Sequence, residues 1–129
     1  MPLAEEIVTS RYRINAYSDD SITVNEAVYR NSLVLSAEDM LTPWPVTTVD
    51  QLEVSHLEII SRLNPEVVLL GTGVRQQFPS ARIFAHFGQQ GIGLEVMDNG
   101  ALCRTFNILV AEDRAVVAAV LINPAEGKD

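Results

Sequence analysis

The sequence lacks a long apolar run. No stretch of its 129 residues approaches the roughly 18 apolar residues that a membrane-spanning helix requires. Glu5 and Glu6 stand where a signal peptide would carry basic residues, so we expect a cytoplasmic protein with no membrane insertion. The length and a hydrophobic content of 47% fit one globular domain over residues 1–129, with an ordered core at about 15–122 and short terminal tails.

Cysteine and histidine are also scarce. Cys103 is the only cysteine, which excludes an intrachain disulfide and fits a reducing compartment. His56 and His86 fall in separate predicted helices without a cluster of further ligands, so we expect no metal site. A lone thiol on a helix flank is typical of a small apolar filler, with a nucleophile as the alternative, and we expect Cys103 to be dispensable.

Positive charge is in short supply as well. The net charge is −8, with 9 basic against 17 acidic residues, and no basic stripe is present. We therefore expect no nucleic-acid partner. Residues 71–111 nevertheless carry 3 Arg against 2 acids, which leaves a small anion open as a ligand of this less acidic middle region.

The motifs that hold nucleotide cofactors are absent. A dinucleotide fingerprint would follow Gly71 and Gly73 with a third glycine, but position 76 is Gln and Pro79 delays the next helix. No Walker lysine follows these glycines either. We therefore expect no cofactor.

What the sequence does contain is an alternation of strands and helices. Short strand patterns fill residues 22–35, and apolar runs predict strands at residues 66–70, 92–97 and 115–122. Helical patterns begin near Ser55, Ser80 and Asp98. This order predicts an α/β fold with a partly parallel sheet, because right-handed crossovers bring such strands side by side.

Two of the predicted helices carry capping signals. Ser55 and Glu58 have the spacing of a capping box, and Asp98 is suited to cap the helix that follows it. The predicted apolar faces of the two longer helices are Ile83, Phe84 and Phe87, and Leu102, Phe106 and Leu109.

Glycine-containing loops follow two neighbouring apolar strands. In an open α/β sheet, ligands bind outside the carboxyl ends of the strands, so we expect these loops to meet in one surface crevice. Backbone N–H groups, a helix N-terminus and an exposed arginine there could face a carboxylate or phosphate. The candidate ligand or partner crevice consists of Gly71, Thr72, Gly73, Arg75, Asp98 and Asn99.

Two motifs carry a resemblance to a known family. They are "PEVVLLGTG" at residues 65–73 and "GIGLEVMDNGALCRTFNILVAEDRAVVAAVL" at residues 91–121. Over about residues 15–122 the chain resembles a widespread family of small domains of unknown function that includes mitochondrial respiratory complex I assembly factor 3. The resemblance implies a three-layer α/β domain, in which helices flank a mixed, partly parallel central sheet and a small additional β layer is present. It also implies protein partners in a respiratory or other assembly.

Several residues match the second family motif without an assigned role. They are Arg104, Asn107, Glu112 and Arg114. We expect Glu112 and Arg114 to form an ion pair across the turn into the last strand. Phe106 stands where the family often has Tyr, so a mechanism that needs that hydroxyl cannot operate here.

Two classes of function remain open. The first is a noncatalytic protein-interaction or assembly module, which is favoured because the sequence places no coherent catalytic constellation. The alternative is a small-molecule or anion-binding protein, including an enzyme, that uses the crevice at the strand ends. We favour the first, so catalytic residues are not assigned.

Overall fold

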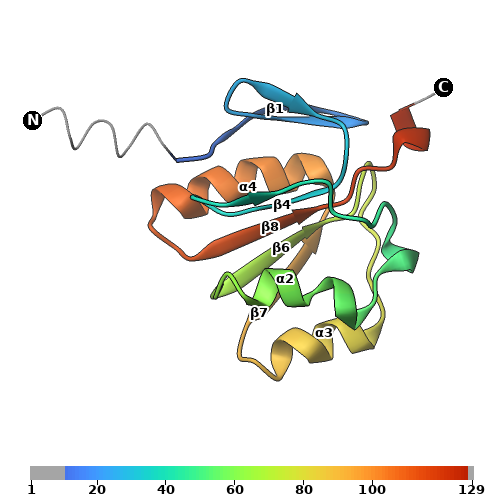
Figure 1. Cartoon of the computed structure of the whole chain (residues 1–129), viewed down its shortest axis with the longest axis vertical. Coiled ribbons are helices and arrows are strands. Elements are labelled where there is room, and N and C mark those ends of the chain that lie inside the picture. Colours follow the sequence, from blue (N-terminus) through green and yellow to red (C-terminus); the bar gives the residue numbers. More distant parts are fainter. Residues whose placement is uncertain (1–10, 128–129) are drawn as a thin grey trace, which may run out of the picture.

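A five-stranded mixed sheet forms the centre of the protein (Figure 1). The computed structural model describes residues 11–127. In the order β5-β4-β8-β6-β7, the strands are Met40–Leu41, Leu33–Leu35, Val116–Val120, Val67–Gly71 and Gly93–Met97. β6 pairs in parallel with β7 and β8, whereas β4 pairs antiparallel with β8 and β5. The prediction that the three apolar runs share one sheet is confirmed.

A second, three-stranded sheet is built by the first third of the chain. It consists of β1 (Ile14–Ser18), β2 (Ser21–Val24) and β3 (Ala27–Tyr29), paired antiparallel in that order. Ile14, Ile22 and Val24 are buried and join a hydrophobic cluster with residues of the larger sheet. The small β layer implied by the family resemblance is therefore present.

Helices and the small sheet cover the two faces of the larger sheet (Figure 1). On one face, α4 (Asn99–Ala111) and the small sheet share a hydrophobic cluster with β4, β6 and β8. On the other, α2 (Glu58–Ser61), α3 (Ala81–Gly88) and the 3-10 turns η1 (Val49–Gln51) and η2 (Val54–His56) form a second cluster. A further turn, η3 (Pro124–Gly127), ends the described chain. This is the predicted three-layer α/β arrangement.

The two central strands are buried on both faces, which explains their apolar sequences. Every residue of β6 and β8 is buried. In β6, Leu69 belongs to one hydrophobic cluster, and Val68 and Leu70 belong to the other. Since successive side chains of a strand point to opposite faces, such a strand needs apolar residues at every position.

Two local predictions about helices are wrong. The capping box is formed by Glu53 and His56 at η2, not by Ser55 and Glu58, because the chain begins to turn before Ser55. The Glu53 side chain accepts from the backbone of His56, and the N–H of Glu53 donates to His56 Nδ1 at 3.0 Å. In α3, Ile83 and Phe87 are buried while Phe84 is exposed, so only two of the three predicted positions face the core.

Candidate functional site

The two predicted loops lie together at one end of the larger sheet. Gly71 ends β6 opposite Met97, the last residue of β7, because these strands run parallel in register. The N–H of Thr72 donates to the carbonyl of Met97 (2.9 Å), and the N–H of Asn99 donates to the carbonyl of Gly73 (2.9 Å). We call this arrangement of Gly71–Gly73 with Asp98 and Asn99 the strand-end bracket.

The side chain of Asn99 is the centre of the bracket. Its Oδ1 accepts from the N–H of Gly73 at 3.1 Å, and its Nδ2 donates to the carbonyl of Leu121 at 2.9 Å. A Cβ atom at position 71 would lie 2.3 Å from Asn99 Oδ1 and 2.9 Å from Leu102 Cδ1. Gly71 is therefore needed because the Asn99 amide and a core leucine occupy the space of a side chain.

Thr72 shapes the loop that leaves the bracket. Its side chain is almost fully buried, and its hydroxyl donates to the carbonyl of Arg75 at 2.6 Å. The same oxygen accepts from the N–H of Gln77 at 3.0 Å. A threonine that bonds to backbone groups three and five residues ahead holds a compact turn, so its hydroxyl is not free to act as a nucleophile.

Asp98 caps α4, as predicted. Its Oδ1 accepts from the N–H of Ala101 at 2.8 Å, and its backbone is extended, as N-cap residues require. The carboxylate thus uses part of the positive end of the helix that was expected to face an anion.

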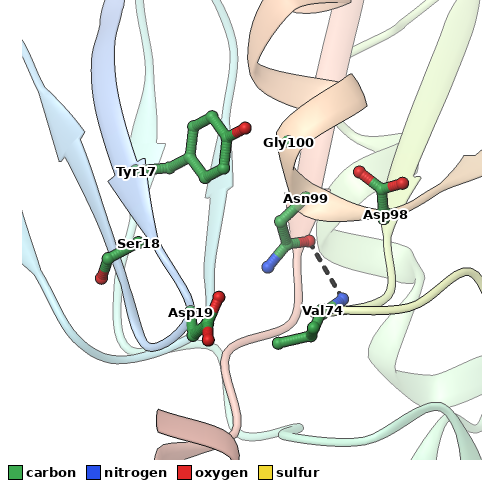
Figure 2. A pocket seen from close by; sticks show the side chains of 8 residues that line it. Tyr17, Ser18, Asp19, Val74, Asp98, Asn99 and Gly100 are labelled. Atoms are coloured by element: carbon green, nitrogen blue, oxygen red, sulfur yellow. Dashed lines mark hydrogen bonds between the residues drawn. The ribbon is translucent and has the colours of Figure 1, made fainter.

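A surface hollow of about 180 Å³ lies beside the bracket (Figure 2). Its lining residues are Tyr17, Ser18, Asp19, Gly73, Val74, Asp98, Asn99 and Gly100. Of the predicted crevice, Gly73, Asp98 and Asn99 line this hollow. Gly71 and Thr72 are buried and the exposed Arg75 lies elsewhere on the surface, so none of the three is part of its lining. The lining includes two carboxylates and no basic side chain.

The sequence analysis did not predict that Tyr17 lines this hollow, or that Gly100 leaves the space its ring occupies. The phenol of Tyr17, in β1, lies against the first turn of α4, where a Cβ at Gly100 would be 2.7 Å from the tyrosine hydroxyl. The two residues are more than 80 positions apart in the sequence. A glycine within the first turn of a predicted helix was the available signal, because glycine is unfavourable there without a packing reason.

The family-motif residues have structural partners that the sequence did not predict. Asn107 Oδ1 accepts from the N–H of Ile14 at 3.0 Å, and Asn107 Nδ2 donates to the carbonyl of Ile14 at 2.7 Å. One amide therefore bonds both backbone groups of Ile14 and ties β1 to α4. Arg104 is exposed on the same helix.

The predicted ion pair between Glu112 and Arg114 is wrong. Arg114 Nε donates instead to Glu66 Oε2 at 2.6 Å, because the parallel pairing of β6 and β8 brings the starts of these two strands together. The hydrogen bond from Arg114, assisted by the N–H of Ala115, holds the pKa of Glu66 below its ordinary value of 4.5. Glu112 is exposed and ends α4.

Cys103 has the surroundings of a packing residue. It is buried, and burial raises the pKa of its thiol to about 11, an effect that the nearby Arg104 only partly opposes. At neutral pH the nucleophilic thiolate is therefore suppressed. Within residues 11–127 we find no group of three or more His, Cys, Asp or Glu side chains that could hold a metal ion.

Fold and motifs together agree with one family of domains. The chain matches the family model described as "Protein of unknown function (DUF498/DUF598)" over residues 14–121, and it belongs to this family. A Xanthomonas campestris protein solved by NMR matches the structure with a TM-score of 0.86 and 39% identity, over 100% of this chain and 98% of that chain.

Two relatives carry names that bear on function. The "13 kDa major membrane protein" of Francisella tularensis is 30% identical over 94% of this chain and 99% of that protein. The zebrafish NADH dehydrogenase 1 alpha subcomplex assembly factor 3 is 32% identical over 87% of this chain. The match covers 65% of the zebrafish protein, just under two thirds of its length. In the part of this chain that the structure describes, no helix is both long and apolar enough to cross a membrane.

Proposed function

We propose that the protein is a noncatalytic docking module that helps to assemble a larger protein complex. The proposal places the module in the cytoplasm and takes the strand-end bracket as a rigid support for a docking loop. A role in a respiratory complex, suggested by the name of the zebrafish relative, is one form of this proposal.

The contrast within the loop at residues 72–80 carries the proposal. Thr72, Gly73 and the neighbouring Asn99 use their polar groups in hydrogen bonds within the chain. In the same loop, Val74 and Phe78 are 46% and 67% exposed. A loop that is fixed by partly buried hydrogen bonds but presents large apolar side chains to solvent fits a preorganised protein-binding element.

The hollow beside the bracket gives less support to the alternative of an anion-binding protein or enzyme. Asp19 and Asp98 line it, and like charges would repel a carboxylate or phosphate. Its volume of about 180 Å³ is below the range of roughly 300–1,000 Å³ that is typical of small-molecule sites. The N–H of Gly73, a donor expected to face an anion, is bonded to Asn99.

A comparison of loop variants tests the proposal. Proteins captured from native lysate by the wild type should be lost with the Val74→Ser/Phe78→Ser double variant, because apolar anchors supply much of the affinity of an interface. Val28→Ser is a matched control, since Val28 is 54% exposed but lies on β3. Both variants should keep the wild-type melting temperature.

Two results would count against docking. One is that the double variant recovers the same proteins as the Val28→Ser control. The other is that phosphate, citrate or a nucleotide raises the melting temperature of the wild type, which would favour the anion-binding alternative.

A further inference from the structure

We infer that the surface seam between β1 and α4 binds an acidic, extended segment of a partner protein. This inference rests on the proposed docking function and adds a second binding surface with a stated chemistry.

Two hollows that share Asn107 form the seam. One, of about 150 Å³, is lined by Arg11, Tyr12, Arg13, Asn107, Val110 and Ala111. The other, of about 340 Å³, is lined by Ile14, Asn15, Ala16, Tyr17, Cys103, Arg104 and Asn107. Together they follow α4 from Cys103 to Ala111, a length of about 12 Å. An extended segment of about four residues covers that length, which suits a peptide better than a small ion.

Asn107 gives the seam a fixed floor. Its amide bonds both backbone groups of Ile14, so the edge of β1 is already satisfied at this point. A bound segment would therefore lie over the seam and recognise it through side chains, without adding a strand to the sheet. Preorganisation of the floor reduces the ordering that binding would otherwise require.

The charge of the seam is opposite to that of the whole chain. The protein carries a net charge of −8, yet three of its nine basic residues line these two hollows. Arg13 and Arg104 are exposed and make no ion pair within residues 11–127, and Arg11 reaches only Asp113, at 3.6 Å. Arg11 Nε is buried without an acceptor among the described residues.

These arginines determine the chemistry of the partner. Guanidinium groups bind carboxylates through paired, charge-assisted hydrogen bonds, and Arg13 and Arg104 are free to do so on either side of Asn107. Tyr17 and Val110 add apolar surface to the same seam. The segment that fits combines acidic side chains, for the arginines, with apolar side chains between them.

The experiment selects binders from a displayed library of random peptides on the wild-type protein of 129 residues. Enriched peptides should be rich in Asp and Glu with interspersed apolar residues. In titrations of isotope-labelled protein followed by NMR, a synthetic copy of the enriched peptide should shift the side-chain amide signals of Asn107 and the backbone signals of Ala16 and Arg104. Binding should weaken as salt is added, because these contacts are exposed.

Matched variants locate the binding surface. Arg13→Gln/Arg104→Gln should weaken the enriched peptide about tenfold or more, since two charge-assisted contacts are lost. Arg62→Gln/Arg82→Gln removes the same charge from exposed arginines outside both hollows and should change binding less than about twofold.

Several outcomes would overturn the inference. In the selection, these are enrichment of neutral or basic peptides, or no enrichment at all. In the titrations, it is an equal loss of affinity in the two double variants. A further one is that the protein binds phosphatidylglycerol vesicles, and not peptides, through these arginines. If the seam does not bind acidic peptides but protein capture still depends on Val74 and Phe78, only the inference about the seam is rejected and the proposed docking function is retained. Loss of that dependence, with acidic peptides still bound at the seam, would reject the proposed docking loop alone.

Discussion

In the strand-end bracket, the side chains of Thr72, Asp98 and Asn99 all bond to backbone groups of the chain, whereas in the seam Arg13 and Arg104 have no such partner among residues 11–127. Polar residues gather in both regions. At the strand end they hold the loops of the chain in place. Unpaired charges on a rigid floor are the better indication of a surface that binds something else.

The largest expected effect is on the bracket. Gly71→Ala should lower the free energy of unfolding by about 3 kcal/mol, because the new methyl group overlaps the Asn99 amide and Leu102. Urea unfolding followed by circular dichroism measures it. Gly88→Ala is the control, since a Cβ there meets nothing within 4 Å, and it should leave stability unchanged or raise it by up to about 1 kcal/mol. Equal effects would mean that the bracket is not tightly packed.

Asn99→Ala tests the hydrogen bonds of the bracket without adding an atom. Loss of the bonds to Gly73 and Leu121 should cost about 2 kcal/mol, because both partner groups are left without their acceptor or donor. Asn31→Ala, at an exposed asparagine, should cost less than about half a kcal/mol in the same unfolding measurement. If Asn99→Ala lowers stability as little as the control does, water must satisfy the backbone groups of Gly73 and Leu121 in place of the amide.

Cys103 lines one hollow of the seam, and its substitution distinguishes a packing role from a reactive thiol. Cys103→Ala should cost about 1 kcal/mol, as expected for a small buried side chain, and should leave protein capture unchanged. Because the thiol pKa is raised to about 11, iodoacetamide should label the folded protein at least roughly a hundredfold more slowly than the unfolded chain at mildly alkaline pH. Loss of all binding in a folded Cys103→Ala protein would instead indicate thiol chemistry.

The smallest expected effect is on the pH dependence of stability, and it distinguishes Arg114, which is paired with Glu66, from Arg104, which makes no ion pair within residues 11–127. The pKa of Glu66 is lowered in the folded protein, so its ion pair with Arg114 contributes stability above the ordinary pKa of 4.5. That contribution is lost as the pH falls through the lower, folded-state pKa. Arg114→Gln should therefore reduce the loss of stability on acidification, while Arg104→Gln should not. Unfolding measured from neutral to acidic pH compares them, and identical pH profiles would contradict the assigned role of Arg114.

The features that could be predicted from the sequence are those determined by residues close together in the chain. The apolar runs of β6, β7 and β8 and the capping role of Asp98 follow from local periodicity and from a side chain that reaches its own helix. Parallel strands then had to place Gly73 and Asn99 at the same end of the sheet, although nothing in the sequence indicated that Asn99 would bond to Gly73 itself.

The features that were missed join residues far apart in the chain. Asn107 and Ile14 are 93 positions apart, and Glu66 and Arg114 are 48 apart. Arg114 had an acidic residue two positions away in the sequence, but the sheet register brought Glu66 closer. Which of several acids an arginine meets is decided by tertiary packing, and one sequence does not contain that information in a readable form.

The central place of β8 has a consequence for how the protein is made. This strand lies between β4 and β6, yet among the strands of the structure it is the last to leave the ribosome. Until residues 116–120 emerge, both of its neighbours present an open hydrogen-bonding edge and apolar side chains to solvent. A nascent chain that stops before Val116 should therefore be prone to aggregation and dependent on chaperones, and the larger sheet can close only after residues 116–120 have been made.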